Sequence, residues 1–231
     1  RLRKVFEWFA LISTPRDSRT GGFRHQPPIG NTYHGEPSGI SGIAAYQWRE
    51  KDPDFAARMQ WMFEQGGSFG GLGIGWNFPS GLGYRFLMKD SGVTAKPARF
   101  GSAWFPKTGV VLRNTMQSDR ETYLHMIAGW NHDHYDVDSG SIILYGKGRA
   151  LSDDWGYIGM HPANWHSMLT SSEASAGGVM LVDTFATNAS LDYVSGKKGA
   201  WQRQIAFAKD ADPLGPTFFV IHDTHSGGSP A

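Results

Sequence analysis

An apolar hairpin is predicted for Gly140–Leu151, whose sequence is GSIILYGKGRAL. Glycines supply the turn between its two short apolar runs, as they do in many antiparallel sheets. The same texture of short strands and frequent turn residues continues on both sides, from Tyr84 onward, without helical periodicity. It predicts a mainly β fold, an antiparallel β-sandwich. The predicted strands are Arg99–Phe105, Gly109–Asn114, Glu121–Trp130, Ser141–Tyr145, Arg149–Ser152, His166–Ser171, Gly178–Asp183, Gln202–Ala208 and Thr217–His222.

The beginning of the chain has a different pattern, with helices predicted over Val5–Leu11 and Gly39–Trp48. Asp52 followed by Pro53 predicts the start of a third helix, because Asp is a good N-cap and Pro fits the first helical turn. Gly66-Gly67 ends it, and the Gly-rich stretch that follows forms a boundary. We therefore expect a helical segment with its linker over residues 1–83 and a β-sandwich over residues 84–231.

The composition narrows the function classes. The net charge of +1 argues against a nucleic-acid or membrane-surface protein, and no run of about 18 apolar residues predicts a transmembrane helix. The chain has no cysteine, so a metal would need histidine and carboxylate ligands. Nine tryptophans offer flat apolar faces that suit sugar rings, although a single tryptophan is more often part of the core. Lys197-Lys198 is interpreted as a surface pair.

The densest polar segment is Gly129–Asp136, which follows the predicted strand. If that strand continues, alternation places His132, His134 and Asp136 on one face. His134, Asp154 and His166 would then come from three neighbouring strands, and such a set suits zinc with one open position. Solvated histidines on a polar strand face remain the alternative interpretation.

Four motifs support the metal-site interpretation: NHDHYD at 131–136, SIILYGKG at 141–148, DWGY at 154–157 and HSML at 166–169. Together they resemble the signature of heparinase II/III-like polysaccharide lyases. The strands around Trp201–Phe207, which contains Arg203, and Phe218–Asp223 resemble later strands of that family. The resemblance covers roughly residues 100–225, and it implies a super-sandwich preceded by the end of an (α/α) toroid.

The resemblance also implies residue roles. The first histidine of the His-x-His motif, His132, would be catalytic, while His134, Asp154 and His166 would bind a structural metal, usually zinc. Asp153 is a rival for the acidic ligand and His161 for the last histidine, and the metal's identity stays open.

Substrate contacts are expected from two places. Asn131 lies beside His132, and the loop Arg24–Glu36 is held by Gly and Pro in a polar sequence. Arg24 could pair with a carboxylate through its planar guanidinium, and His25 and Tyr33 are further candidates. An ordinary connecting loop is the alternative.

The expected function is β-elimination of a uronic-acid glycan, alginate-like or glycosaminoglycan-like, by a longer enzyme that includes this chain. A bacterial periplasmic or secreted location is expected, with a homodimer as one assembly and neither nucleic acid nor membrane as partner. The alternatives are a non-catalytic glycan-binding or structural sandwich with a zinc staple, and a metal-dependent hydrolase that activates water.

Overall fold

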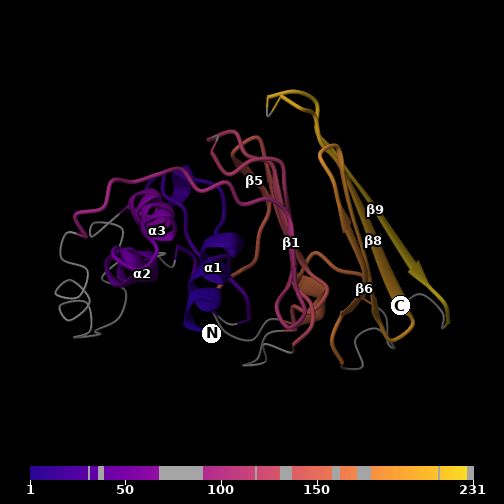
Figure 1. The fold of residues 1–231 in the computed structure, drawn as a ribbon. Helices are drawn as coiled ribbons and strands as arrows, with labels where there is room; N and C mark the ends of the chain where they lie inside the picture. The colour runs from indigo at the N-terminus through magenta and orange to yellow at the C-terminus, as the bar shows by residue number, and fades with distance from the viewer. Residues whose placement is uncertain are drawn as a thin grey trace. The chain divides into compact units, whose positions relative to one another are not determined.

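The computed structural model describes residues 1–30, 32–35, 39–67, 91–117, 119–130, 137–157, 162–170, 178–212 and 214–227. It divides into two compact units, drawn in Figure 1. The first contains Arg1–Pro27 and His34–Phe100, and the second contains Pro28–Tyr33 and Gly101–Ala231. The boundary expected after residue 83 falls among residues outside the described part. The short segment Pro28–Tyr33 belongs to the second unit although it is early in the sequence.

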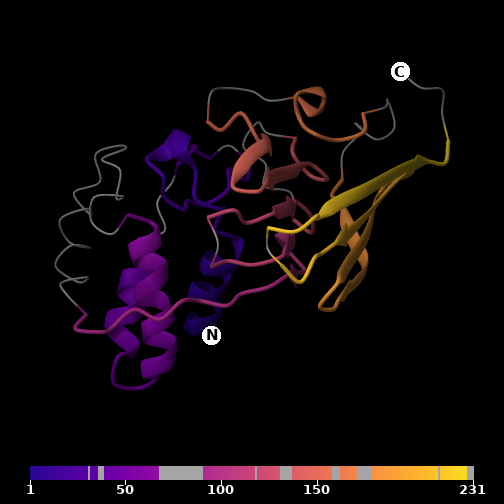
Figure 2. The ribbon, with the colours of Figure 1, turned by 90° about the horizontal axis from the view of Figure 1, so that it is seen from above.

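The first unit is helical in its described part, with α1 (Leu2–Ile12), a 3₁₀ turn η1 (Ser18–Thr20), α2 (Ile40–Trp48) and α3 (Pro53–Gln65). Helices α2 and α3 lie side by side in Figures 1 and 2. The predicted start of α3 is confirmed, because the Asp52 carboxylate accepts a hydrogen bond from the backbone N–H of Phe55 at 3.0 Å. Gly66 caps its end as expected.

The described strands of the second unit form two antiparallel sheets. Each follows simple up-and-down order, β1-β2-β3-β4-β5 and β6-β7-β8-β9. The five-stranded sheet contains β1 (Ala103–Phe105), β2 (Gly109–Arg113), β3 (Tyr123–Met126), β4 (Ile142–Gly146) and β5 (Arg149–Ser152). The four-stranded sheet contains β6 (Leu181–Thr187), β7 (Leu191–Lys198), β8 (Trp201–Ala208) and β9 (Phe218–His225), and a 3₁₀ turn η2 (Ala163–Trp165) lies between the sheets in sequence.

One hydrophobic core joins the two sheets. Val110, Leu124 and Ile142 of the first sheet pack with Trp201 and Phe207 of the second in a single buried cluster. In β2, β3 and β8 alternate residues enter this cluster, as expected where each sheet turns one face to the other. The predicted antiparallel β-sandwich preceded by a few helices is therefore confirmed.

The hairpin predicted over Gly140–Leu151 is confirmed as β4 and β5. Its two turn residues, Lys147 and Gly148, have φ values of +50° and +77°. Positive φ at both positions characterises the tight turn that matches the twist of the strands. A side chain at Gly148 would also collide with the carbonyl oxygen of Asp119. Both the positive φ and this close contact therefore require glycine at position 148.

Three differences from the predicted strands stand out. β7 is absent from the prediction, and its sequence carries Asp192 and two lysines. β3 ends at Met126, short of the predicted Trp130, and Gly129 follows with φ +92°. The predicted strand from His166 is wrong for its described residues 166–170, which follow η2 without joining a sheet.

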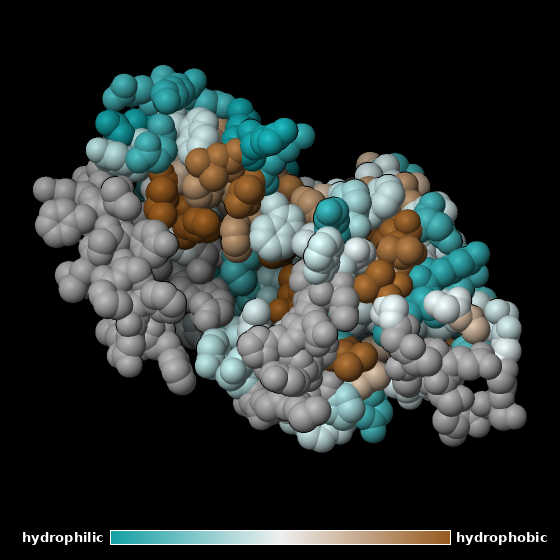
Figure 3. Space-filling model, turned by 90° about the horizontal axis from the view of Figure 1, so that it is seen from below, coloured by the Kyte–Doolittle hydropathy of each residue, from teal (hydrophilic) through white to brown (hydrophobic). Residues whose placement is uncertain are grey.

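Hydrophobic side chains on the face drawn in Figure 3 gather in separate patches with hydrophilic residues between them. Among the described helices, none is both long and apolar enough to span a bilayer.

Candidate functional site

Asp154 and His166, two of the three predicted metal ligands, are in direct contact. Asp154 follows the end of β5, and His166 directly follows η2. The Nδ1 atom of His166 lies 2.9 Å from Oδ2 of Asp154, and their side chains are only 0% and 2% exposed. The other carboxylate oxygen accepts the backbone N–H of Gly156 at 3.0 Å. This turn fixes the carboxylate toward the imidazole, which the spacing of twelve residues alone could not establish.

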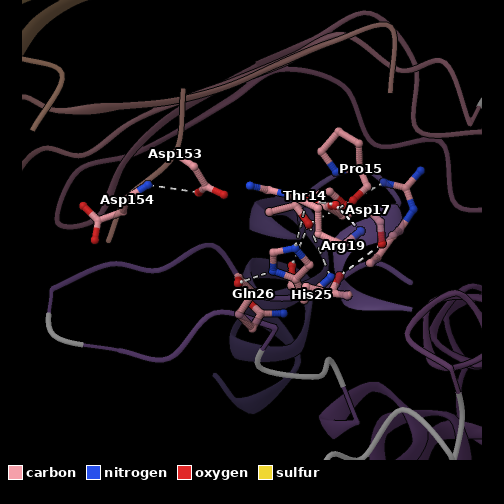
Figure 4. Close-up of polar contacts among 10 residues, drawn as sticks. Thr14, Pro15, Asp17, Arg19, His25, Gln26, Asp153 and Asp154 are labelled. Atoms are coloured by element: carbon pink, nitrogen blue, oxygen red, sulfur yellow. Dashed lines mark hydrogen bonds and ion pairs between the residues drawn. The ribbon is translucent and has the colours of Figure 1, made fainter. Parts of the chain in front are cut away.

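The neighbouring Asp153 has a different role in the described structure. Its Oδ1 accepts a hydrogen bond from the backbone N–H of Asp154 at 3.0 Å, as Figure 4 shows. Of the two adjacent carboxylates considered as ligands, Asp154 is therefore the one that contacts His166.

An arginine of the second sheet holds the backbone beside His166. Arg203 of β8 donates to the carbonyl oxygens of Ser167 at 2.8 Å and Gly140 at 2.7 Å. Its remaining nitrogens make a two-point ion pair with Asp223 of β9, at 2.9 and 2.8 Å. Arg203 thus connects the sheet to both the His166 segment and the residues before β4.

The charge on Asp223 is stabilised by this arrangement. Burial works to raise the pKa of Asp223, but the hydrogen bonds and positive charge of Arg203, with a further hydrogen bond from Trp201, outweigh it. The pKa of the carboxyl therefore lies below its usual value, and Asp223 stays ionised beside Arg203 at neutral pH.

A second buried anchor holds the residues that lead into β4. Lys198 of β7 donates to the carbonyl oxygen of Ser139 at 3.1 Å and is 2% exposed. The expectation of a surface lysine pair is therefore wrong for Lys198, because its strand turns it into the sandwich. Burial lowers the pKa of Lys198, and the negative charge of Asp138 offsets part of this shift.

Asp138 also holds the early segment. Its carboxylate accepts a hydrogen bond from the backbone N–H of Gly30 at 2.6 Å, which ties Pro28–Tyr33 to this unit.

Tyr33 lies on that early segment and contacts the Asp154 loop. Its ring centroid is 4.8 Å from that of Tyr157, with the planes inclined by 37°. Both phenols are partly exposed, at 38% and 41%. The structure thus brings one predicted substrate-binding residue to within three residues of Asp154, through a contact that spans more than a hundred positions of sequence.

Two tryptophans flank the buried pair and were given no role from the sequence. Trp155 follows Asp154 and Trp165 precedes His166, with ring centroids 5.8 Å apart and planes inclined by 50°. The indole N–H of Trp155 donates to the backbone oxygen of Trp165 at 2.9 Å. The sequence contained one usable signal, an aromatic residue next to each of two predicted ligands.

Arg24 and His25 lie in the helical unit and are both buried, at 1% and 2% exposure. Arg24 donates to the carbonyl oxygen of Thr14 at 3.0 Å, and its guanidinium lies 5.7 Å from the ring of Trp61. The Nδ1 of His25 is 2.9 Å from the Gln26 carbonyl oxygen, and Nε2 is 3.9 Å from Asp17 (Figure 4). These contacts lie within the loop and its unit, so substrate binding by Arg24 and His25 stays a prediction.

The remaining predicted residues lie outside the described part of the chain: Asn131, His132, His134 and His161. Within the described part, no group of three His, Cys, Asp or Glu side chains could hold a metal ion. The described structure therefore supplies two of the three predicted donors, and the third prediction, His134, is untested.

The donor chemistry of Asp154 and His166 fits a zinc ion. An imidazole nitrogen and a carboxylate oxygen are ordinary zinc donors, and burial of both side chains would shield the ion from water. A carboxylate that accepts the N–H of an imidazole also fixes the ring of a metal-bound histidine. The pair can therefore act as two ligands, or as one ligand and the group that orients it.

No family model matches the sequence, and no curated protein matches it.

Proposed function

We propose that this chain is the sandwich portion of a polysaccharide lyase that cleaves a uronic-acid glycan by β-elimination. The observation that carries the proposal is the buried contact between Asp154 and His166. The resemblance to heparinase II/III-like lyases assigns both residues to one metal site, although they are twelve positions apart. Their side chains meet at 2.9 Å, which that assignment requires.

In this proposal, Asp154 and His166 hold a structural zinc ion together with His134. When bound, zinc would cross-link the loop after β5 to the segment after η2 and add to folding stability. Arg203 and Gly156 hold the two protein segments through the hydrogen bonds described above. These hydrogen bonds hold the donor atoms of Asp154 and His166 in place. Removal of one of them should therefore also weaken metal binding.

The reaction itself needs three tasks from side chains. The uronate carboxylate must be neutralised, a base must remove the C5 proton, and an acid must protonate the O4 leaving group. His132 is proposed as base or as stabiliser of the developing charge, with Asn131 facing the substrate. Tyr33 contributes a partly exposed phenol beside the Asp154 loop, where it can bind substrate hydroxyl or carboxylate groups.

Activity of the full-length protein tests the proposal directly. The protein is incubated with alginate, hyaluronan and heparosan, and absorbance of the unsaturated uronide product is followed. We expect product from at least one polymer, and we expect His132→Ala to reduce the rate by at least about a hundredfold. An absence of unsaturated product from all three polymers, with release of saturated ends instead, would support the hydrolase and overturn the lyase.

Metal analysis separates the catalytic proposal from its main alternative. Purified wild-type protein should contain about one zinc ion per chain, and Asp154→Asn and His166→Gln should lose it. Zinc that depends on both residues, combined with full activity of His132→Ala, would assign the sandwich a structural or binding role.

A further inference from the structure

The exposed tryptophan pair beside the buried Asp154–His166 contact has the form of a ligand-binding surface. We propose that Trp155 and Trp165 form a stacking platform for the C–H face of a neutral pyranose ring in a glycan. The inference rests on the proposed function only for the choice of glycan, because stacking needs neither the metal nor β-elimination.

Exposure of the two indoles is the first argument. Trp155 and Trp165 are 52% and 51% exposed, whereas Trp201 in the sandwich core is fully buried. A scattered exposed aromatic residue is common on protein surfaces and carries no meaning alone. Two half-exposed indoles in ring contact at 5.8 Å instead expose a continuous apolar surface, which is the kind of patch that marks binding sites.

Rigidity is the second argument. The hydrogen bond from Nε1 of Trp155 to the backbone oxygen of Trp165 fixes one indole against the other segment. The residues next to them in sequence, Asp154 and His166, are themselves in buried contact. The two rings are therefore placed before any ligand arrives, and a preformed surface loses less conformational entropy on binding.

The shape and surroundings of the surface select the ligand. Planes inclined by 50° form two facets of small area, which suit one sugar ring better than a broad protein or membrane surface. Tyr157 lies on the same loop as Trp155, and Tyr33 of the early segment contacts its ring. Both phenols are partly exposed, and their hydroxyl groups can hydrogen-bond to sugar hydroxyls.

Charge narrows the choice further. The platform consists of two uncharged indole rings, and an ionised carboxylate or phosphate group brought against an apolar surface loses hydration that a neutral sugar does not lose. The stacked unit is therefore a neutral sugar. A glycan in which neutral and uronate sugars alternate meets this requirement together with the proposed chemistry, whereas a polymer of uronate alone does not.

Binding calorimetry with two probes tests the platform. The probes are a hyaluronan hexasaccharide, in which neutral and uronate sugars alternate, and an alginate hexasaccharide, in which every sugar is a uronate. All proteins are full chains that carry His132→Ala, so that the probes stay intact. We expect the hyaluronan probe to bind more tightly than the alginate probe.

The decisive variant is Trp165→Ala, because it removes one ring and keeps the backbone oxygen that binds Trp155. It should weaken hyaluronan binding by about tenfold or more, as truncation of a central aromatic contact commonly does. Trp165→Phe keeps an aromatic face and should retain most of the affinity, which makes the test independent of a folding defect in the alanine variant.

Trp104→Ala is the matched control. Trp104 is 41% exposed and lies on β1, at the opposite edge of the five-stranded sheet from β5. Its loss should leave binding unchanged. Equal affinity of Trp165→Ala and its parent would overturn the platform, and so would an equal loss in Trp104→Ala or failure of the parent to bind hyaluronan. Unsaturated product from alginate by the wild type would leave the lyase proposal standing in each of those cases.

Discussion

The two units each contain a buried carboxylate–imidazole pair, and the pairs differ in their partners. Asp17 in the helical unit receives hydrogen bonds from the backbone and guanidinium of Arg19, and His25 is 3.9 Å away. In the described part of the sandwich, Asp154 makes no contact with an arginine and meets His166 at 2.9 Å. The same residue types thus form a charge-neutralised loop contact in one place and a candidate metal site in the other.

From this difference we expect partner chemistry, more than residue type or burial, to separate a structural carboxylate–imidazole pair from one that binds a metal. An arginine fork satisfies a carboxylate and leaves little reason for a cation to bind it. A carboxylate whose nearest side chain is an imidazole keeps electron pairs that a metal can use. Two predictions test this contrast directly, and a third tests the ion pair of Arg203 that supports the Asp154–His166 region.

The largest expected difference comes from removing each imidazole. His166→Ala should abolish zinc binding and lower the free energy of unfolding by about 3 kcal/mol, because it leaves a buried carboxylate without its partner. His25→Ala should lower the free energy of unfolding by only about 1 kcal/mol and leave the zinc content unchanged, since Arg19 still neutralises Asp17. Urea unfolding and metal analysis measure both effects. Equal losses in the two variants would break the contrast.

An intermediate effect is expected from the arginine that holds each region. Arg203→Met should lower the free energy of unfolding by about 2 kcal/mol and weaken zinc binding by about tenfold, because the Ser167 and Gly140 carbonyls lose their donor. Arg19→Met should cost less than about 1 kcal/mol, since the Arg19 side chain is 52% exposed. A larger loss in Arg19→Met than in Arg203→Met would reverse the assignment.

The smallest effect is expected from pH. The folded state holds the pKa of Asp223 below its ordinary value of 3.8. The stabilisation it gives is fully present above that ordinary value and is lost as the pH falls through the lower folded pKa. The free energy of unfolding of Asp223→Asn should therefore fall less than that of the wild type as the pH drops below about 4. The difference should not exceed about 1 kcal/mol, because Asp223 is partly exposed. Unfolding midpoints measured at decreasing pH check this, and parallel curves for the two proteins would contradict it.

Much of the backbone was predictable because its signals are local. Asp52 and Pro53 start α3 with groups only a few residues apart, and Gly148 adopts the positive φ that the β4–β5 turn requires. β7 escaped prediction because Asp192 and Lys198 are charged, and charged residues are seldom buried unless tertiary contacts pair them. Asp192 meets Lys209, and Lys198 meets the Ser139 carbonyl oxygen, in contacts that local pattern does not contain.

The candidate site divides in the same way. The sequence by itself determined the fold class, the hairpin and the choice of Asp154 and His166, since turn chemistry, strand texture and motif are properties of neighbouring residues. Only the tertiary structure decided that these two side chains meet, that Tyr33 returns to Tyr157, and that Trp155 and Trp165 stay exposed beside them. Those outcomes depend on how two sheets and their connecting loops pack, and packing brings together residues whose separation along the chain carries no record of the contact.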